Sequence, residues 1–202
     1  RGYDFGAWKE GIQKFGFDRI KDYDQLLMVN NSCYVPVNDL SYMFKVMESK
    51  NVDFWGPTLF PYLSDGSYIN KPYIKEHIQS FFQVYEKNVI ASDSFREYWE
   101  NMKTFDKLED VVANCETEIT DYFKNKGFKY DVLLEETSIL STYLVDYSIP
   151  YNHPYELLIL GCPFVKKKAT KSMSDDQKVK VLNFVRMTNS DLYKILVKDM
   201  YC

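Results

Sequence analysis

Carboxylate side chains are the groups in this sequence best suited to move a proton. Glu116 opens a stretch of helical spacing, with apolar residues at 119 and 123, that ends at Gly127. A carboxylate is ionised at neutral pH without a large pKa shift, so Glu116 could act as a general base. The helix dipole also favours acidic residues in a first turn, so a capping role stays open. Glu118 faces another side of the predicted helix and is the weaker candidate.

A polar triplet follows the first strongly apolar segment. Residues 25–29 read QLLMV, which is typical of a strand buried on both faces, and Asn30, Asn31 and Ser32 come directly after it. Amide and hydroxyl groups can hydrogen-bond a phosphate or a ribose. They are weak ligands for hard cations such as Mg²⁺, which prefer carboxylate oxygen. An ordinary Asn-rich turn after a strand is the other interpretation of this triplet.

Several common classes of protein are excluded by the motifs and the charge. The Walker phosphate loop, GxGxxG, GxSxG and zinc-protease motifs are all missing. The four cysteines show no CxxC spacing, which predicts reduced thiols rather than a zinc site or a disulfide framework. With 25 basic and 29 acidic residues the net charge is −4, so the chain has no overall electrostatic footprint for nucleic acid.

Helical and extended segments alternate along the chain, which favours an α/β layered fold. Helices are predicted over residues 5–17, 37–50, 92–102, 108–126 with a break near 114, and 175–196. Strands are predicted over residues 25–29, 52–56, 77–89 and 130–134, with a polar loop over 62–73. Expected caps are Asp4, Asn38 or Asp39, and Ser92 or Asp93.

Aromatic residues make up 17% of the chain, and half of them are the 17 tyrosines. A tyrosine ring offers an apolar face and a polar edge, which suits stacking on sugar rings or bases. Filling the core is the simpler interpretation, so the excess alone identifies no ligand.

Six short segments between residues 2 and 167 occur in an order that is hard to obtain by chance. They are GYDFGAW (2–8), NNSCYVP (30–36), DFWG (53–56), the block HIQSFF…FREYW (77–99), ETEITDYFKNKGF (116–128) and PFVKK (163–167). Together they resemble the rhamnan synthesis protein F family of bacterial polysaccharide glycosyltransferases.

The resemblance implies a fold of the GT-A type, a partial Rossmann-like mixed sheet with flanking helices and a helical C-terminal segment. Residues 1–135 would form the central and acceptor part of the domain, and residues 136–202 a mostly helical extension. Because the donor-binding strands of such enzymes come first, a donor part of about 70 to 100 residues is expected before Arg1.

The resemblance also implies roles for the polar residues already singled out. Glu116 is the expected catalytic base and Asp53 the runner-up. Asn30, Asn31 and Ser32 stand where this fold places a D-x-D triplet that holds a divalent ion on the donor. Since both carboxylates of that triplet are missing, a dependence on Mg²⁺ or Mn²⁺ is doubtful.

Further substrate contacts follow from the same resemblance, each beside a structural alternative. Asp4 would bind the donor's ribose or base, or else cap a helix. Trp55 would stack on the sugar, or else belong to the core. His77 would contact the diphosphate or the acceptor, or else be a hydrogen-bonded structural residue. Lys166, in a cluster that extends to Lys171, would neutralise the leaving diphosphate, or else lie on a solvated surface.

An inverting transfer of a sugar from a nucleoside diphosphate is therefore the expected activity, with dTDP-rhamnose as the expected donor. The expected acceptor is a growing cell-surface glycan or a lipid-linked glycan. The alternative is a non-catalytic carbohydrate-binding or scaffold domain of a polysaccharide assembly system. Unpaired cysteines, no secretory signal and no apolar run near 20 residues favour the cytoplasm, with the lysine cluster touching the inner face of the membrane.

Overall fold

The computed structural model describes residues 2–134 and 149–201, and these divide into two compact units. Unit 1 comprises Arg1–Asn30 and Lys50–Val132, and unit 2 comprises Asn31–Ser49 and Leu133–Cys202. The second cut lies near the boundary expected at residue 135. Residues 31–49 join the C-terminal segment instead, because they contribute a strand and buried side chains to it.

Unit 1 is built on a sheet with the strand order β1–β5–β3–β4, in which β6 also pairs with β3. Both β1 and β3 are antiparallel to β5, so they run in the same direction with β5 between them. The fold is mixed α/β, as the alternation of segments predicts. The strands are β1 (Gln25–Val29), β3 (Phe54–Phe60), β4 (His77–Ile78), β5 (Phe82–Glu86) and β6 (Tyr130–Leu134).

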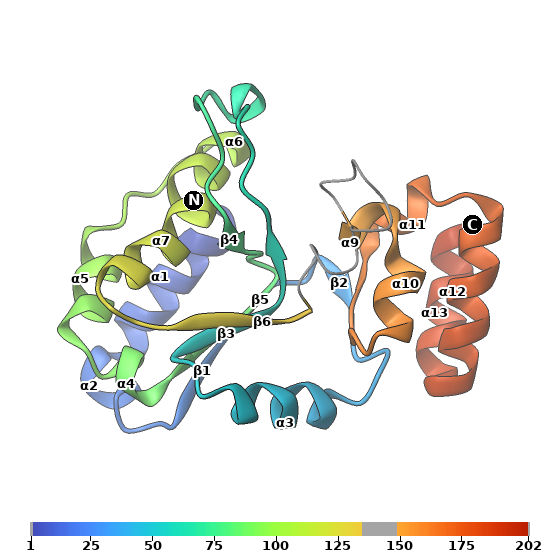
Figure 1. The fold of residues 1–202 in the computed structure, drawn as a ribbon, viewed down its shortest axis with the longest axis horizontal. Coiled ribbons are helices and arrows are strands. Elements are labelled where there is room, and N and C mark those ends of the chain that lie inside the picture. Colours follow the sequence, from blue (N-terminus) through green and yellow to red (C-terminus); the bar gives the residue numbers. More distant parts are fainter. Residues whose placement is uncertain (1, 135–148, 202) are drawn as a thin grey trace. The chain divides into compact units, whose positions relative to one another are not determined.

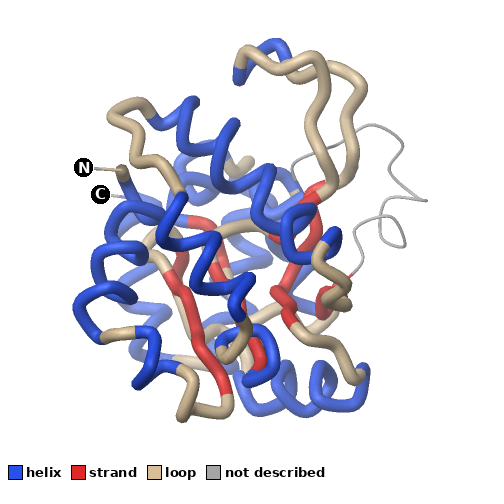
Figure 2. The backbone as a smooth tube through the Cα atoms, turned by 90° about the vertical axis from the view of Figure 1, so that its left-hand side faces the viewer, coloured by secondary structure: helices blue, strands red, loops and turns tan. Residues whose placement is uncertain are grey.

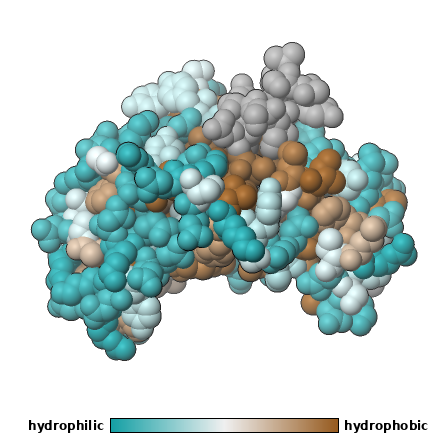
Figure 3. All heavy atoms as spheres, turned by 60° about the horizontal axis from the view of Figure 1, so that its bottom comes forward, coloured by the Kyte–Doolittle hydropathy of each residue, from teal (hydrophilic) through white to brown (hydrophobic). Residues whose placement is uncertain are grey.

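Helices cover one face of this sheet (Figures 1 and 2). They enclose an aromatic core in which Phe123 contacts the rings of Phe54, Tyr85 and Phe95. The surface of unit 1 drawn in Figure 3, in the left-hand part of the picture, is mostly hydrophilic. The helices are α1 (Tyr3–Phe15), α2 (Phe17–Ile20), α4 (Lys87–Ile90), α5 (Asp93–Asn101), α6 (Leu108–Val111) and α7 (Thr117–Asn125).

The strand β1 has the expected bounds but not the expected burial. It pairs with β5 alone and forms an edge of the sheet. Met28 is buried, whereas Leu27 and Val29 are each 43% exposed. The expectation of burial on both faces is therefore wrong, because a continuous apolar run does not reveal the position of a strand in its sheet.

The strand expected over residues 77–89 is interrupted by a bulge. Leu59 pairs with Ile78 and Trp55 pairs with Val84, so residues 56–58 lie opposite residues 79–83. We call Gln79–Phe81 the bulge. It also explains why β3 runs through Gly56 and Pro57 rather than ending there, since a proline opposite a bulge removes no ladder hydrogen bond.

An arm of residues 61–76 extends between β3 and β4 (Figures 1 and 2). Bridges between Leu63 and Ile74 and between Gly66 and Lys71 join its two sides, and its tip is the 3₁₀ turn η1 (Ser67–Ile69). Ile69 and Ile74 pack with Ala113 of the helical segment that precedes α7. The loop predicted over 62–73 is thus held against a helix.

The helix predicted over 108–126 is continuous but not uniform. A π-helical turn, η2 (Val112–Glu116), lies between α6 and α7, at the break expected near residue 114. Gly127 ends the helix with φ +93°, as its position predicts. Ser92 caps α5 by accepting the Phe95 N–H at 3.1 Å.

Unit 2 is mostly helical around one strand pair. β2 (Cys33–Tyr34) is antiparallel to β7 (Val165–Lys166). Asp39 accepts the Ser41 N–H at 2.8 Å at the start of α3. The helices are α3 (Leu40–Lys50), α9 (Ile149–Asn152), α10 (Pro154–Ile159), α11 (Lys167–Ser172), α12 (Asp175–Thr188) and α13 (Ser190–Tyr201).

The terminal helix expected over 175–196 is two helices. The chain leaves helical geometry at Asn189, with φ −150° and ψ 94°. The Asn189 side chain then accepts the Leu192 N–H at 3.0 Å, which caps α13. In the described residues, 2–134 and 149–201, no helix combines the length and the apolar character needed to cross a membrane.

Candidate functional site

Two residues expected at the donor lie in contact in unit 1. The Asp4 carboxylate accepts a hydrogen bond from Asn30 Nδ2 at 2.9 Å, across 26 residues of sequence. Asp4 lies in the first turn of α1, whereas Gly2 occupies the cap position in a left-handed conformation. The expectation that Asp4 caps this helix is therefore wrong, and its carboxylate is turned to the end of β1.

The bulge joins this pair to Glu116. The Asn30 N–H donates to the Phe81 carbonyl oxygen at 3.3 Å, and the Ser80 N–H donates to Glu116 Oε1 at 2.9 Å. Ser80 and Phe81 are adjacent, so their Cα atoms are only about 3.8 Å apart. We call Asp4, Asn30, Ser80, Phe81 and Glu116 the bulge site.

Glu116 closes the π-helical turn and is half-buried. It is not in a first helical turn, since α6 and η2 precede it, so the capping interpretation is wrong. Burial, with the negative charge of Glu116, raises the pKa of Tyr68 on the arm. The same two causes raise the pKa of the Cys115 thiol to about 12. Single π-helical turns recur at functional sites, where they place a side chain out of the regular helical register.

Buried polar side chains hold the bulge in place. Thr58 Oγ1 donates to Gln79 Oε1 at 2.6 Å, and Gln83 Nε2 donates to the Ile78 carbonyl at 3.0 Å. The Ile78 N–H donates to Thr120 Oγ1 at 3.0 Å. Such satisfied buried networks make a local backbone conformation rigid. The sequence signal for this support is polar residues inside an apolar strand, at Gln79, Ser80 and Gln83.

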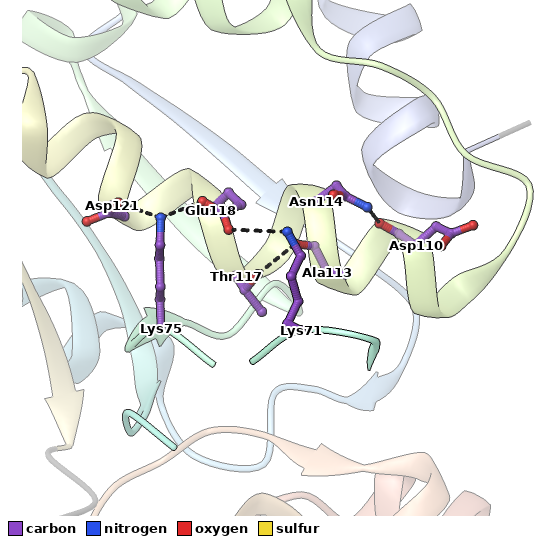
Figure 4. A network of polar contacts seen from close by, with 8 residues as sticks. All are labelled: Lys71, Lys75, Asp110, Ala113, Asn114, Thr117, Glu118 and Asp121. Carbon is purple, nitrogen blue, oxygen red and sulfur yellow. Dashed lines mark hydrogen bonds and ion pairs between the residues drawn. The ribbon is translucent and has the colours of Figure 1, made fainter. Parts of the chain in front are cut away.

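Glu118 has a different role from Glu116. It forms an ion pair with Lys75 at 2.6 Å and lies 3.9 Å from Lys71, while Lys75 also contacts Asp121 at 2.8 Å (Figure 4). Burial opposes the charge of Lys75, but its hydrogen bonds and ion pairs with Asp121 and Glu118 outweigh burial and raise its pKa. This network ties the arm to α7.

Asp53 lies at the opposite end of the sheet from Asn30. The register pairs Val29 with Phe82, whereas the Asp53 carbonyl accepts the Glu86 N–H at the other end of β5. The Asp53 carboxylate accepts bonds from Asn88 Nδ2 at 2.5 Å and from the Lys129 N–H at 2.6 Å. These bonds join β3 to its neighbours, and Asp53 lies apart from the bulge site.

Trp55 and His77 are buried. Trp55 is 2% exposed and donates from Nε1 to Glu86 at 3.0 Å, so its core interpretation is confirmed and it offers no face to a sugar. His77 is 4% exposed, with Nδ1 at 2.7 Å from the Lys75 carbonyl and its ring stacked on Phe60. These contacts support the structural interpretation of His77.

Ser32 and Lys166 meet within unit 2. Lys166 Nζ donates to Ser32 Oγ at 3.3 Å, beside the pairing of Cys33 with Lys166. The Ser32 carbonyl accepts the Lys167 N–H at 2.9 Å, and Asn31 is exposed. The polar triplet thus divides between the units, with Asn30 in unit 1 and Asn31 and Ser32 in unit 2.

The groups around the triplet do not fit a divalent ion held by carboxylates. At the end of β1 the Asp4 carboxylate accepts a hydrogen bond from the Asn30 amide. Within residues 2–134 and 149–201, no group of three or more His, Cys, Asp or Glu side chains could hold a metal ion. Mg²⁺ and Mn²⁺ prefer sites richer in carboxylate oxygen.

Removal of divalent metal is therefore expected to weaken nucleotide-sugar binding by the intact protein less than about tenfold, or roughly 1.4 kcal/mol. The amide of Asn30 and the hydroxyl of Ser32 can hydrogen-bond a phosphate or a ribose without a bridging ion. Calorimetric titration of the donor with and without EDTA measures the difference. A larger loss of affinity on chelation would contradict this expectation.

Comparisons with known proteins found a matching family model and a similar protein. The family model described as RgpF, rhamnan synthesis protein F, matches residues 1–201. The uncharacterized protein y4gN of Sinorhizobium fredii (strain NBRC 101917 / NGR234) is 26% identical over 143 residues, which are 70% of this chain and 35% of that protein. The chain thus spans about a third of the length of this relative. No solved structure matches the chain.

Proposed function

The chain belongs to the rhamnan synthesis protein F family, whose model covers residues 1–201, and from this we propose that it is part of a glycosyltransferase that extends a cell-surface polysaccharide. The observation that carries this proposal is the bulge site. A carboxylate–amide pair, Asp4 and Asn30, and a second carboxylate, Glu116, bond to two adjacent residues of the bulge, Phe81 and Ser80, which supports the proposal.

In the proposed reaction the donor is a nucleoside diphosphate sugar, with dTDP-rhamnose as the favoured one. The acceptor hydroxyl oxygen attacks the anomeric carbon and forms the new glycosidic bond. Glu116 takes the hydroxyl proton, and the bond from the anomeric carbon to the diphosphate breaks to release the nucleoside diphosphate. One displacement at this carbon inverts its configuration. The Ser80 N–H fixes Glu116 Oε1, which orients the carboxylate for the transfer.

Each unit by itself offers polar groups that suit a part of such a donor. Asp4 and Asn30 offer an acceptor and an amide to the ribose or the base. In unit 2, Lys166 and Ser32 offer an ammonium and a hydroxyl to a phosphate.

We further propose that the fold is GT-A-like. Support comes from the parallel orientation of β1 and β3 with the antiparallel β5 between them, and from the polar residues that follow β1. The residues of the triplet differ from the D-x-D of that fold.

The proposed place of action is the cytoplasm, against the inner face of the plasma membrane. Lys167, Lys168 and Lys171 are exposed on α11 and could contact anionic headgroups. Sedimentation with anionic vesicles at low salt tests the contact, and full recovery of the protein in the supernatant would contradict it.

The experiment that tests the proposed activity measures release of nucleoside diphosphate by the intact protein from a panel of nucleotide sugars. Release that depends on the acceptor glycan and is fastest with dTDP-rhamnose is the expected result. The alternative is a non-catalytic carbohydrate-binding or scaffold domain, which the missing carboxylates of the triplet favour. Such a domain would bind glycan and release no nucleotide from any donor.

A further inference from the structure

A polar cavity lies beside the base of the arm in unit 1. Its volume is about 330 Å³, within the range of about 300 to 1,000 Å³ that is usual for small-molecule sites. The arm, α7 and β6 all contribute to its wall. We call it the arm pocket, and its lining residues are Tyr62, Lys75, Glu76, Thr120, Asp121, Lys124 and Tyr130.

Two tyrosines give the arm pocket its aromatic surface. Tyr62 is 57% exposed and lies 5.8 Å from the ring of Tyr73, which is also exposed. Tyr130 is fixed, because its ring stacks on Phe54 and its hydroxyl donates to Glu76 Oε1 at 2.6 Å. An exposed ring next to fixed polar groups suits a ligand with an apolar face and a polar rim.

The polar groups of the arm pocket are balanced in charge. Lys75 contacts Asp121 at 2.8 Å, and Lys124 lies 5.6 Å from the Tyr130 ring. Two ammonium groups therefore stand against the carboxylates of Glu76 and Asp121. Such a set offers both donors and acceptors but no net field for an ion, so it suits a neutral ligand with many hydroxyl groups.

The arm that carries Tyr62 is held in place on α7. Lys75 bonds to Glu118 and Asp121, and Lys71 lies near Glu118, as Figure 4 shows. Ile69 and Ile74 add apolar contacts with Ala113. A site fixed in this way needs little ordering when a ligand binds, which favours affinity.

The arm pocket lies along the same helix as Glu116. Thr120 follows Glu116 by one helical turn and Lys124 by two, which corresponds to about 6 and 12 Å along the axis. Thr120 and Glu116 both bond to backbone groups at residues 78–80. A short oligosaccharide with its end at Glu116 would therefore reach the arm pocket.

We propose that the arm pocket binds a neutral pyranose residue of the acceptor glycan, some way from the end that reacts. Tyr62 packs on a face of the ring, and Glu76, Asp121 and Lys124 bond to its hydroxyl groups. This inference rests on the proposed function, since it names where the glycan of that reaction is held.

Tyr62→Ala tests the proposal in the intact protein. With an α-linked rhamnose tetrasaccharide as the probe, binding is expected to weaken about three- to tenfold, the effect of one lost aromatic contact. Tyr62→Phe keeps the ring and is expected to bind within about twofold of wild type. Tyr23→Ala removes a similarly exposed tyrosine that does not line the arm pocket, and it serves as the matched control.

Binding is measured by calorimetry without donor, so the result does not depend on catalysis. Equal affinity of the wild type and Tyr62→Ala for the tetrasaccharide would overturn the proposed role of the arm pocket. If the wild-type protein still transfers sugar, the proposed glycosyltransferase function is unaffected by that result. Conversely, weakened binding in a protein that releases no nucleotide would support the arm pocket and contradict the glycosyltransferase.

Discussion

Replacing Glu116 with Gln is expected to lower the rate of sugar transfer by the intact protein about 10²- to 10⁴-fold, the usual loss when a general base is removed. The amide keeps the shape of the side chain, and its oxygen can still accept the Ser80 N–H that Glu116 accepts at 2.9 Å. The loss of transfer rate would therefore reflect the lost basicity of the side chain rather than a change in its position. Donor affinity is expected to stay within a few-fold of wild type.

Glu118→Gln is the matched control for this prediction, because it makes the same change two residues away. Glu118 pairs with Lys75, and both side chains are only about one-third exposed. The control is expected to keep turnover near wild type when the acceptor is saturating. Near wild-type transfer by Glu116→Gln would show that Glu116 only supports the bulge.

Replacing Gly56 with Ala is expected to lower the free energy of unfolding by about 1 to 3 kcal/mol, as overpacking of a filled core does. A Cβ at Gly56 would collide with the Ile78 side chain and lie 2.9 Å from the Phe82 carbonyl oxygen. Both neighbours flank the bulge that carries Ser80. Urea unfolding followed by tryptophan fluorescence measures the change, since Trp8, Trp55 and Trp99 all belong to unit 1.

Replacing Gly11 with Ala is expected to change the free energy of unfolding in the opposite direction in the same assay. Gly11 lies inside α1, and a Cβ there would meet no atom within 4 Å. Alanine is therefore expected to stabilise unit 1 by about 0.5 to 1 kcal/mol, since glycine loses more backbone freedom on folding. Equal effects of the two substitutions would contradict the close packing at Gly56.

Local signals in the sequence predicted the elements whose ends are set by neighbouring residues. Ser92 begins α5 and Gly127 ends α7, because a side-chain cap and a left-handed glycine act within a few residues. The strands β1 and β6 also have their expected bounds. The family resemblance assigned Asp4 and Asn30 to substrate binding and Glu116 to catalysis. In the structure Asp4 bonds to Asn30, and Asn30 and Glu116 bond to the neighbouring residues Phe81 and Ser80.

Features that depend on distant residues could not be predicted. The bulge arises because Gly56 leaves room for Ile78, and Thr58 and Thr120 then satisfy its polar groups across 21 and 42 residues. Asp53 and Trp55 were expected near the substrate because they lie in a family-like motif. Strand register, which no short motif encodes, places Asp53 at the far end of the sheet and buries Trp55.

Transfer of a labelled sugar into glycan is the measurement that tests the glycosyltransferase most directly. The intact protein is incubated with dTDP-rhamnose labelled in the sugar, together with a lipid-linked glycan acceptor. The bulge site, with Glu116 as base, predicts label in the glycan and an equal amount of released dTDP, both lost in Glu116→Gln. Glycan that binds to the protein but gains no label, with dTDP-rhamnose and the other nucleotide sugars alike, would contradict it.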